Sequence, residues 1–232
     1  MTRKPFVSDR GEDRGGGLPP AVNGGPLAWF GRLVLGLFGW RVVGALPEAR
    51  RYVMIAAPHT SNWDFPIMLL CGMVLGVWPR WAGKHTLFTP PFGWVMLWLR
   101  GIPIDRRTSS NKVDQLVARI AQSEDIALLV PPEGTRSYAP YWKSGFYHVA
   151  CKAGVPLAFG FLDYARKEGG IGPAFMPSGN VQEDMDRIRA FYSQRTGLHP
   201  EWAGPMRLRA EDGVEDADAG RSGSPPGSGG AG

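Results

Sequence analysis

The sequence predicts an α/β fold in which a largely parallel sheet is flanked by helices, with an interfacial helix at the N-terminus. Short apolar runs of strand length alternate with longer segments of helical length. This alternation is typical of parallel strands joined by crossover helices. In addition, the apolar runs at 52–57 and 126–130 each end in a proline and a polar turn, as expected where strands reach the edge of a sheet. The sequence contains no internal repeat.

Composition predicts one folded domain at 27–209. The chain has 232 residues, of which 44% are hydrophobic and 11% aromatic, enough for a single core. Residues 1–26 are rich in glycine, proline and charge and lack the apolar centre of a secretion signal, so we expect a disordered leader. Residues 210–232 are first acidic and then rich in glycine, serine and proline. This composition predicts a disordered tail.

The first predicted element is a helix at 27–43 in the membrane interface. The segment is interrupted by Arg32 and is too short for the ~20 apolar residues that a bilayer-spanning helix needs. Its aromatic residues and two arginines suit a helix that lies along a membrane surface. The alternative is a helix that packs on the core of the domain itself.

The remaining elements follow in order from the same patterns. The apolar run 52–57 predicts a strand, and the apolar segment 65–77 behind the next turn predicts a helix. Residues 102–104 are the centre of a short alternating segment and predict a strand. The other expected elements are strands at 80–83, 126–130, 157–162 and 174–177 and helices at 92–99, 111–122, 147–153 and 183–195.

Charge is unevenly distributed along the chain. The net charge is +5 overall, but residues 27–209 carry 21 Lys and Arg against 13 Asp and Glu, a net charge of +8. A basic folded surface suits nucleic acid, anionic lipid or phosphorylated substrates. The sequence has no nucleic-acid-binding module and no regularly spaced platform of aromatic and basic residues. We therefore expect lipid and phosphate as partners and no nucleic acid.

The spacing of cysteine and histidine argues against a disulfide framework or a metal site. Cys71 and Cys151 have apolar neighbours and no CxxC spacing, so we expect both in the core. The four histidines share no metal-ligand spacing, and we expect His148 and His199 at the surface or in packing contacts. Neither a GxSxG motif nor a phosphate-binding GxxxxGKS or GxxxxGKT loop is present. We therefore expect no metal and no cofactor.

The strongest functional signal is a histidine followed five residues later by an aspartate. His59 and Asp64 lie directly behind the strand predicted at 52–57. Two side chains with this separation point roughly 140° apart on a helix and to opposite faces on a strand. A strand that ends at Pro58, followed by a turn whose residues 60–62 cap a helix, brings them together. An imidazole held by a carboxylate is suited to act as a general base. The structural alternative is a loop histidine beside a first-turn acid.

Two further predicted strands end in polar residues. Strand 126–130 is followed by Pro-Pro-Glu-Gly-Thr-Arg-Ser at 131–137, and residues 102–104 are followed by an aspartate and two arginines. In open α/β sheets, ligands bind at the carboxyl ends of the strands, so we expect base, carboxylates and guanidiniums to converge there. Cations at such a rim suit a phosphate. The candidates are Lys84, Arg106 and Arg136, with Arg107 equal to Arg106 on charge alone.

These residues resemble the glycerolipid acyltransferases related to bacterial 1-acylglycerol-3-phosphate acyltransferase. That family carries the blocks NHxxxxD, GxxxxxR, FPEGTRS and VPxxP in this order. The chain has PHTSNWD at 58–64, GIPIDRR at 101–107, PPEGTRS at 131–137 and Val-Pro-Leu at 155–157. Pro58 and Pro132 replace the asparagine and the phenylalanine of the family blocks, and the second proline of the last block is absent. The sequence looks like a short bacterial branch of that family.

The resemblance implies an acyltransferase in phospholipid biosynthesis. A fatty acyl chain would move from acyl-CoA or acyl carrier protein, the thioester co-substrate, to the hydroxyl of a lysophospholipid, with 1-acylglycerol-3-phosphate as the acceptor. The enzyme would be a peripheral protein on the cytoplasmic face of the cell membrane. The alternatives are an amino-lipid or glycolipid acceptor, a noncatalytic homologue that binds membrane lipid, and a hydrolase or transacylase.

The resemblance also implies roles for individual residues. His59 would act as the general base and Asp64 would orient it, while backbone amides at 58–62 could face the oxyanion. Glu133, Gly134, Thr135 and Arg136 would form the acceptor-binding block, with Glu133 holding the loop through hydrogen bonds. An acyl-chain groove and a lipid-facing surface would come from aromatic residues, the alternative being plain core; the candidates are Trp78, Trp81, Phe92, Trp94 and Trp98.

Overall fold

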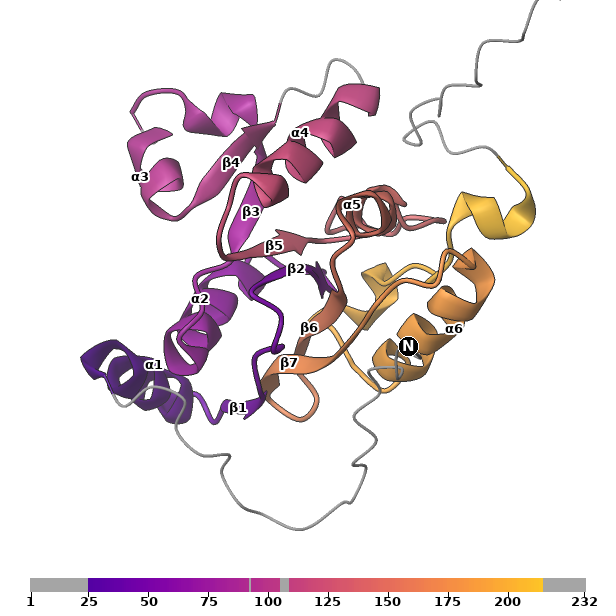
Figure 1. The fold of residues 1–232 in the computed structure, drawn as a ribbon. Helices are drawn as coiled ribbons and strands as arrows, with labels where there is room; N and C mark the ends of the chain where they lie inside the picture. The colour runs from indigo at the N-terminus through magenta and orange to yellow at the C-terminus, as the bar shows by residue number, and fades with distance from the viewer. Residues whose placement is uncertain (1–24, 92, 105–108, 215–232) are drawn as a thin grey trace, which may run out of the picture.

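The computed structural model describes residues 25–91, 93–104 and 109–214. These residues form a seven-stranded sheet with the order β1-β7-β6-β2-β5-β3-β4 (Figure 1). All neighbouring strands are parallel except β6 and β7. The strands are β1 Arg41–Gly44, β2 Arg51–Ala56, β3 Arg80–Lys84, β4 Gly101–Ile104, β5 Ile126–Val130, β6 Leu157–Asp163 and β7 Glu168–Phe175. The predicted α/β fold with a largely parallel sheet is confirmed.

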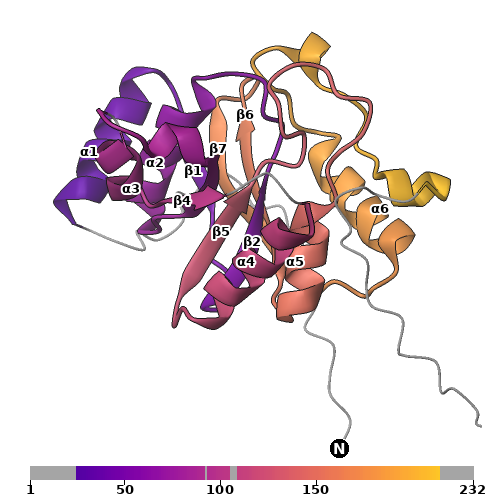
Figure 2. The same cartoon turned by 90° about the horizontal axis from the view of Figure 1, so that it is seen from above.

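Helices cover both faces of the sheet. α4, α5 and α6 lie on one face and α1 and α2 on the other, while α3 lies beside the edge strand β4 (Figure 2). The helices are α1 Pro26–Leu37, α2 Asp64–Leu75, α3 Gly93–Trp98, α4 Ser109–Ala121, α5 Gly145–Ala153 and α6 Val181–Tyr192, with short 3₁₀ helices η1 His85–Phe88, η2 Pro200–Trp202 and η3 Arg209–Asp212. From α2 onward, the predicted helices are present, and their ends are shifted by at most three residues.

The central strand β2 needs cover on both sides. Val53 and Ile55 pack in the core cluster that contains residues of α4, α5 and α6, whereas Tyr52 and Met54 pack in the cluster that contains Leu75 of α2. Successive side chains of a strand point to opposite faces. A strand that is apolar at every position is therefore stable only between two layers.

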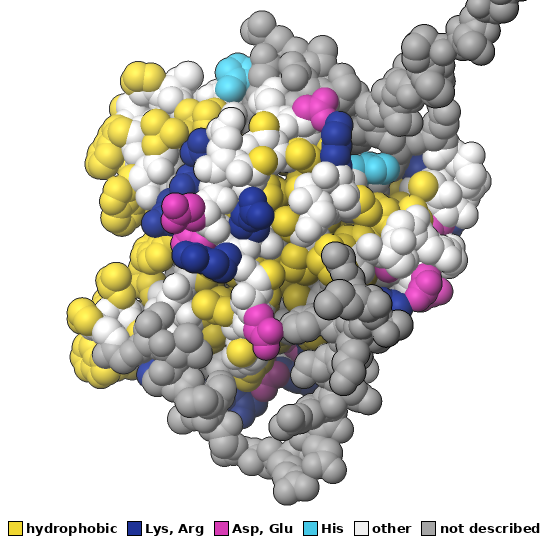
Figure 3. Space-filling model, viewed as in Figure 1, with side chains coloured by type: hydrophobic (Ala, Val, Ile, Leu, Met, Phe, Trp, Pro, Cys, Tyr) yellow, Lys and Arg dark blue, Asp and Glu magenta, His cyan; other side chains and the backbone are white. Residues whose placement is uncertain are grey.

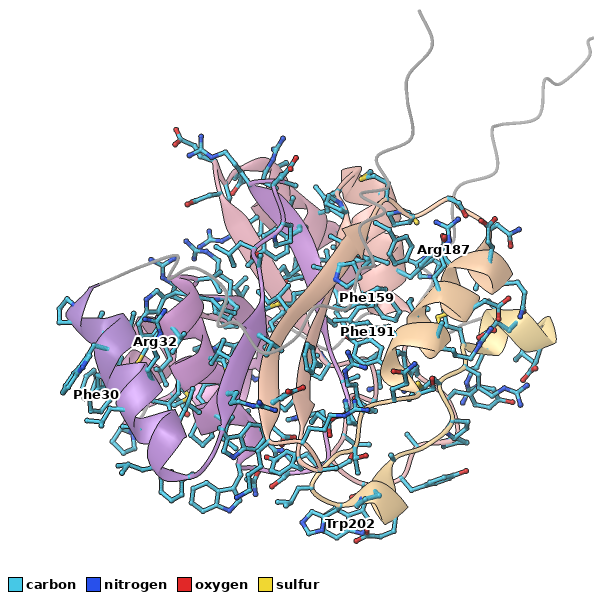
Figure 4. All side chains as sticks on the ribbon, turned by 90° about the horizontal axis from the view of Figure 1, so that it is seen from below. Phe30, Arg32, Phe159, Arg187, Phe191 and Trp202 are labelled. Carbon is cyan, nitrogen blue, oxygen red and sulfur yellow. The ribbon has the colours of Figure 1, made fainter. Side chains whose placement is uncertain are left out.

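Helix α6 is attached to the sheet by aromatic residues. Phe191 stacks on Phe159 of β6 with ring centroids 4.7 Å apart (Figure 4). The hydroxyl of the fully buried Tyr192 shares its one hydrogen between the carbonyl oxygens of Ile55 and Gly160, at 3.1 and 3.0 Å. These contacts connect α6 to β2 one residue before the end of that strand and to the middle of β6.

The N-terminal helix is shorter than the helix predicted at 27–43. That prediction is wrong at its C-terminal end, because α1 ends at Leu37 and Arg41–Gly44 forms β1, which pairs with β7. Gly39 has a φ of 74°, a left-handed conformation that glycine adopts readily and that ends a helix. The sheet thereby gains an edge strand that the sequence did not indicate.

The two sides of α1 differ in character. Ala28, Gly31 and Leu35 are buried, and a Cβ on Gly31 would lie 2.9 Å from the carbonyl oxygen of Leu70 in α2. The alternative of a helix packed on the core therefore describes this side. The opposite side is apolar and exposed, and Phe30 on it points away from the sheet (Figure 4). None of the helices in the described part of the chain combines the length and the apolar composition that a bilayer-spanning segment requires.

Strand β7 begins earlier than the strand predicted at 174–177 and forms an antiparallel hairpin with β6. Its first residues, Glu-Gly-Gly-Ile-Gly, have low strand propensity. Tertiary packing explains the glycines: a Cβ on Gly170 would lie 1.9 Å from the carbonyl oxygen of Val43, and one on Gly169 would lie 2.8 Å from the sulfur of Cys71. The close approach of β1 and α2 to this strand therefore leaves no room for a side chain at these two glycines.

Two predictions at the edges of the domain need correction. Cys71 is buried as expected, but Cys151 is exposed, because it lies on the outer side of α5 while Val149 and Ala150 face the core. The predicted tail begins too early, because η3 packs on α6, where Arg189 Nη1 lies 2.6 Å from Glu211 Oε1. Residues 1–24 of the predicted leader and 215–232 of the predicted tail lie outside the described residues.

Candidate active site

His59 and Asp64 meet in the turn between β2 and α2. Nδ1 of His59 lies 2.9 Å from Oδ2 of Asp64. β2 ends at Ala56 and Asp64 is the first residue of α2, so the predicted strand, turn and helix and the contact between the two side chains are confirmed. When Nδ1–H donates to the carboxylate, the lone pair of Nε2 is free to accept a proton.

The carboxylate of Asp64 is buried and accepts three hydrogen bonds. In addition to His59, the amide of Ser61 donates to Oδ2 at 3.0 Å, and the hydroxyl of Tyr164 donates to Oδ1 at 2.7 Å. These donors stabilise a charge that is costly to bury alone. Tyr164 belongs to none of the motifs recognised in the sequence. Its only signal is its position directly behind β6.

The prediction that one of residues 60–62 caps α2 is wrong. The N-cap position is Trp63, without a side-chain cap, and its amide donates to Oγ of Ser61 at 3.1 Å. Thr60 is buried, and its Oγ1 accepts a hydrogen bond from the amide of His199 at 3.1 Å. The turn is therefore held by the side chains of Ser61 and Thr60, of which the second binds the C-terminal segment.

Glu133 connects the turn behind β5 to the turn behind β2. Its Oε1 accepts a hydrogen bond from the backbone amide of His59 at 3.1 Å. The side chain is buried, and Oε2 has no hydrogen-bond partner among the described residues. Burial raises the pKa of Glu133 to about 6, while the amide of His59 acts in the opposite direction. Because β2 and β5 are parallel neighbours, the two turns meet at one edge of the sheet.

The loop behind β5 depends on Gly134 and Thr135. Gly134 has a φ of 66°, and a Cβ there would lie 2.7 Å from Cε of Lys143. Another residue type would be strained at this φ, and its Cβ would displace the flexible end of the Lys143 side chain. Oγ1 of Thr135 accepts the amide of Ser137 at 3.2 Å. In this loop conformation Arg136 is exposed and lines the same cavity as His59.

The other two predicted cations are only partly located. Lys84 is the last residue of β3, and its backbone pairs with Ile104 at the same edge of the sheet. Its side chain lies outside the described part of the structure. Arg106, together with Arg107, falls in the segment 105–108, which also lies outside the described residues.

A cavity of about 660 Å³ opens beside His59 and Asp64. Its walls are mainly apolar and come from α2 and from the face of the sheet that α2 covers; they include Met54, Phe65, Met68, Leu75, Trp81 and Leu129. Polar side chains line the cavity where the motif residues gather, namely His59, Asn62, Asp64 and Arg136. The volume lies within the range of roughly 300–1,000 Å³ that is usual for small-molecule sites.

The aromatic residues proposed for an acyl-chain groove separate into two groups. Trp81 lines the cavity, where it contacts the ring of Phe65 edge-on, with centroids 5.5 Å apart. Trp94 and Trp98 are instead exposed, at 73% and 71%. Phe92 lies outside the described residues, and Trp78 is not part of the described cavity lining.

A family model described as Acyltransferase matches residues 41–158. The matched segment is just over half of the 232 residues. The chain belongs to the acyltransferase family. The match runs from β1 into β6 and contains both motif turns, so the family assignment made from the motifs is confirmed.

Among solved structures, this acyltransferase is similar to the crystal structure of the 1-acyl-sn-glycerophosphate (LPA) acyltransferase, PlsC, from Thermotoga maritima. The two chains are 17% identical with a TM-score of 0.46, and the alignment covers 74% of this chain and 80% of that chain. No curated protein matches the sequence.

The site of this acyltransferase therefore combines three chemical elements. His59 offers a proton acceptor whose orientation is held by Asp64. The cavity offers an apolar surface within reach of the same imidazole. Arg136 offers an exposed guanidinium that forms no ion pair with the described acidic residues. Within the described residues, no group of three or more His, Cys, Asp or Glu side chains could hold a metal ion.

Glu133 should make the stability of the enzyme pH-dependent. The folded-state pKa of about 6 lies above the usual 4.5, so its contribution to stability is greatest below pH 4.5 and is lost as the pH rises through 6. We expect the free energy of unfolding of wild type, relative to Glu133→Gln, to fall by about 2 kcal/mol between pH 4 and pH 7. Urea denaturation at several pH values measures this difference.

The matched control for this measurement is Glu48→Gln, because Glu48 is an exposed glutamate. The difference between wild type and this control should remain nearly constant over the same pH range. A constant difference between wild type and Glu133→Gln would show that burial does not penalise the Glu133 carboxylate.

Proposed function

We propose that the enzyme transfers a fatty acyl chain from a thioester of coenzyme A or acyl carrier protein to the hydroxyl of 1-acylglycerol-3-phosphate, a lysophospholipid, in phospholipid biosynthesis. The observation that carries this proposal is the position of the His59–Asp64 pair and Arg136 on one largely apolar cavity of about 660 Å³. In a lysophospholipid, the hydroxyl would meet the His59–Asp64 pair, the acyl chain would enter the apolar cavity, and the phosphate would bind Arg136.

The chemistry follows from the free Nε2 of His59. A thioester is already an activated donor, so the reaction needs a deprotonated hydroxyl in line with its carbonyl carbon. Nε2 takes the proton as the acceptor oxygen attacks, and Asp64 stabilises the resulting imidazolium through Nδ1. The C–S bond then breaks, and the thiolate takes the proton as it leaves. The acyl group passes directly between substrates without a covalent enzyme intermediate.

The oxyanion of the tetrahedral intermediate needs nearby donors. In the turn 58–62, the amides of His59 and Ser61 already donate to Glu133 and Asp64, and Pro58 has no N–H. Among the described residues, the amides of Thr60 and Asn62 make no hydrogen bond. Of these two residues, Asn62 lines the cavity, and we therefore assign the oxyanion to its amide.

The cavity suits an acyl chain. Its wall is largely apolar, and each methylene group moved from water into such a site contributes about 0.8 kcal/mol. Binding energy of this kind, remote from the reacting atoms, holds the ester or hydroxyl end near the imidazole. Arg136 is placed to bind the phosphate through its forked donors, with Lys84 and Arg106 as further candidates in the same role.

The membrane contact that we propose is an exposed apolar surface on α1, α3 and the catalytic turn. We call this surface the apolar rim; it consists of Leu27, Trp29, Phe30, Leu33, Leu37, Phe38, Trp63, Trp94, Leu97 and Trp98. Hydrophobic side chains gather over α1 and α3 on the same side of the molecule (Figure 3). Exposed apolar side chains that gather on one side of a protein mark an interaction site, and exposed tryptophans suit the interface of a bilayer. This arrangement supports a peripheral membrane enzyme, and we propose the cytoplasmic face of the cell membrane as its location.

The apolar rim extends to the catalytic turn. Gly31 of α1 lies against Leu70 and Val74 of α2, whereas Trp40, just beyond α1, contacts Tyr164 beside Asp64. The two helices therefore run antiparallel, and the C-terminal end of α1 lies near the beginning of α2. Trp63 precedes Asp64 directly and is 66% exposed. A membrane bound to the rim would lie close to the site that receives the lipid.

Loss of the base tests the function. We expect His59→Ala to lower acyl transfer by about 100-fold or more, the usual scale for a positioned general base. Purified protein is incubated with acyl-CoA or acyl carrier protein donors and a panel of lyso-lipids with phosphate, amino-lipid or glycolipid head groups, and products are followed by mass spectrometry. His148→Ala on α5 is the matched control and should remain active.

The proposal predicts that the phosphate acceptor gives the highest kcat/KM in this panel. A higher kcat/KM for a lyso-lipid without phosphate would contradict the proposed acceptor. Release of free fatty acid without any acylated lipid would instead identify a thioester hydrolase.

Exchange of Arg136 for lysine tests the phosphate contact. Lysine keeps the charge but loses the fork that binds phosphate with two parallel hydrogen bonds, so we expect Arg136→Lys to raise the KM for the acceptor roughly tenfold. The KM for the thioester and kcat should change little. Arg50→Lys, an exposed arginine just before β2, is the control. An effect on the thioester KM alone would assign Arg136 to the phosphates of the donor.

Removal of aromatic side chains from the apolar rim tests the membrane contact. The pair Trp29→Ser and Phe30→Ser should reduce co-sedimentation with phosphatidylglycerol vesicles by at least about tenfold, because two exposed aromatic groups lose their burial in lipid. Met176→Ser, which removes another exposed apolar side chain, should leave binding unchanged. Binding by the double variant at the wild-type level would exclude α1 from the membrane contact.

A further inference from the structure

Tyr164 is the donor to Asp64 that comes from outside the catalytic turn. Its hydroxyl lies 2.7 Å from Oδ1, whereas His59 and Ser61 share Oδ2 at 2.9 and 3.0 Å. Tyr164 is 100 positions along the chain from Asp64. Among the described residues, the hydrogen bond from Tyr164 is therefore the one bond to this carboxylate that depends on tertiary structure and not on the local turn.

The position of Tyr164 follows from the sheet. It comes directly after β6, and β6 is the parallel neighbour of β2, so the residues behind both strands reach the same edge. The amide of Tyr164 donates to the carbonyl oxygen of Thr196 at 2.9 Å. The side chain of the buried Asp163 accepts the amides of Ala165 and Arg166 at 3.1 and 3.3 Å. The backbone that carries the tyrosine is therefore held on both sides.

The ring of Tyr164 is also held in place. Trp40 contacts it edge-on, with ring centroids 4.9 Å apart and planes at 89°, a favourable geometry for two aromatic rings. Trp40 lies between α1 and β1, and it packs with Tyr164 around the cluster of Leu35, Cys71 and Leu162. The hydroxyl thus approaches Asp64 from a ring that has little freedom to rotate away.

The hydroxyl remains a donor at all relevant pH values. Burial first, and then the hydrogen bond and charge of Asp64, raise the pKa of Tyr164 well above its usual range. The phenol therefore keeps its proton while the enzyme works. The ionisable groups around the Asp64 carboxylate are His59 at Oδ2, Tyr164 at Oδ1 and Glu133, which interacts with both His59 and Asp64.

We propose that Tyr164 is a positioning residue for acyl transfer, because its hydroxyl holds the carboxylate of Asp64 in the orientation that meets Nδ1 of His59. The proposal rests on the proposed role of His59 as the base. A carboxylate held at Oδ2 alone can turn about its Cβ–Cγ bond. Tyr164 opposes that rotation at Oδ1, and its hydrogen bond also disperses part of the negative charge that faces the imidazole.

Removal of this hydroxyl should have a kinetic effect that a packing role would not produce. In Tyr164→Phe the ring and its contact with Trp40 are kept, and we expect kcat to fall about tenfold, the scale of one hydrogen bond to a charged group. The KM values for both substrates should change little. The less dispersed charge on Asp64 should hold a proton on the imidazole more tightly, so the acidic limb of the profile of kcat/KM against pH should move to higher pH.

The fold supplies a matched control for this variant. Tyr147 on α5 donates its hydroxyl to the buried Asp184 at 2.8 Å, so Tyr147→Phe removes a bond between the same two residue types away from the site. Its melting temperature should fall about as much as that of Tyr164→Phe, while its kcat and pH profile should remain those of wild type. Equal kinetic effects in the two variants would overturn the proposal.

Double variants and a second contact complete the test. In an Asp64→Asn background, Tyr164→Phe should cause no additional loss of kcat, because the two residues act as one unit. Trp40→Leu, which keeps the hydroxyl but removes the ring that holds it, should lower kcat in the same direction by a smaller factor. Wild-type kcat and pH profile in Tyr164→Phe would overturn the positioning role while leaving the proposed function intact. An active His59→Ala would overturn the proposed function itself.

Discussion

The buried carboxylate of Asp64 is the constraint on which the catalytic edge of this acyltransferase depends. A carboxylate removed from water is costly unless hydrogen-bond donors replace the solvent. Here the donors are the imidazole of His59, the amide of Ser61 and the hydroxyl of Tyr164. They bring together the proposed base, the backbone of the turn and the segment behind β6. The same set of hydrogen bonds therefore stabilises the charge of Asp64 and orients the imidazole of His59.

The two faces of the sheet have different physical characters. On the face of α4, α5 and α6, large side chains fill the space, and Trp142, Phe146 and Tyr192 pack in one cluster. On the face of α2, a cavity of about 660 Å³ is left unfilled, although a well-packed core would close such space. Packing on the first face supports the sheet, while the second face retains the room that an acyl chain needs.

The same edge also contains a carboxylate that is only partly satisfied. Glu133 uses one oxygen to hold the backbone of His59, its other oxygen has no partner among the described residues, and burial raises its pKa to about 6. A charge at this position lowers stability. An unfilled cavity and an incompletely satisfied carboxylate side by side are features expected where function, rather than stability, determines the structure. The apolar rim, which includes Trp63 of the catalytic turn, continues this pattern to the surface.

The sequence by itself determined the features that arise from local chain geometry. The apolar run before His59 and the acid five residues later required a strand, a turn and a helix, and the parallel strands implied by the alternating pattern placed Glu133 and Arg136 at the same edge.

Features that depend on contacts between distant segments were decided only by the tertiary structure. β1 forms at the end of the segment that was predicted as a helix, and β7 forms in a glycine-rich segment, because the two strands pair with each other. They lie too close together for a side chain at Gly170. The cavity exists because α2 does not fill the space above its face of the sheet, and Tyr164 joins Asp64 because β6 lies beside β2. No local pattern encodes such neighbours, since they result from the packing of the whole sheet.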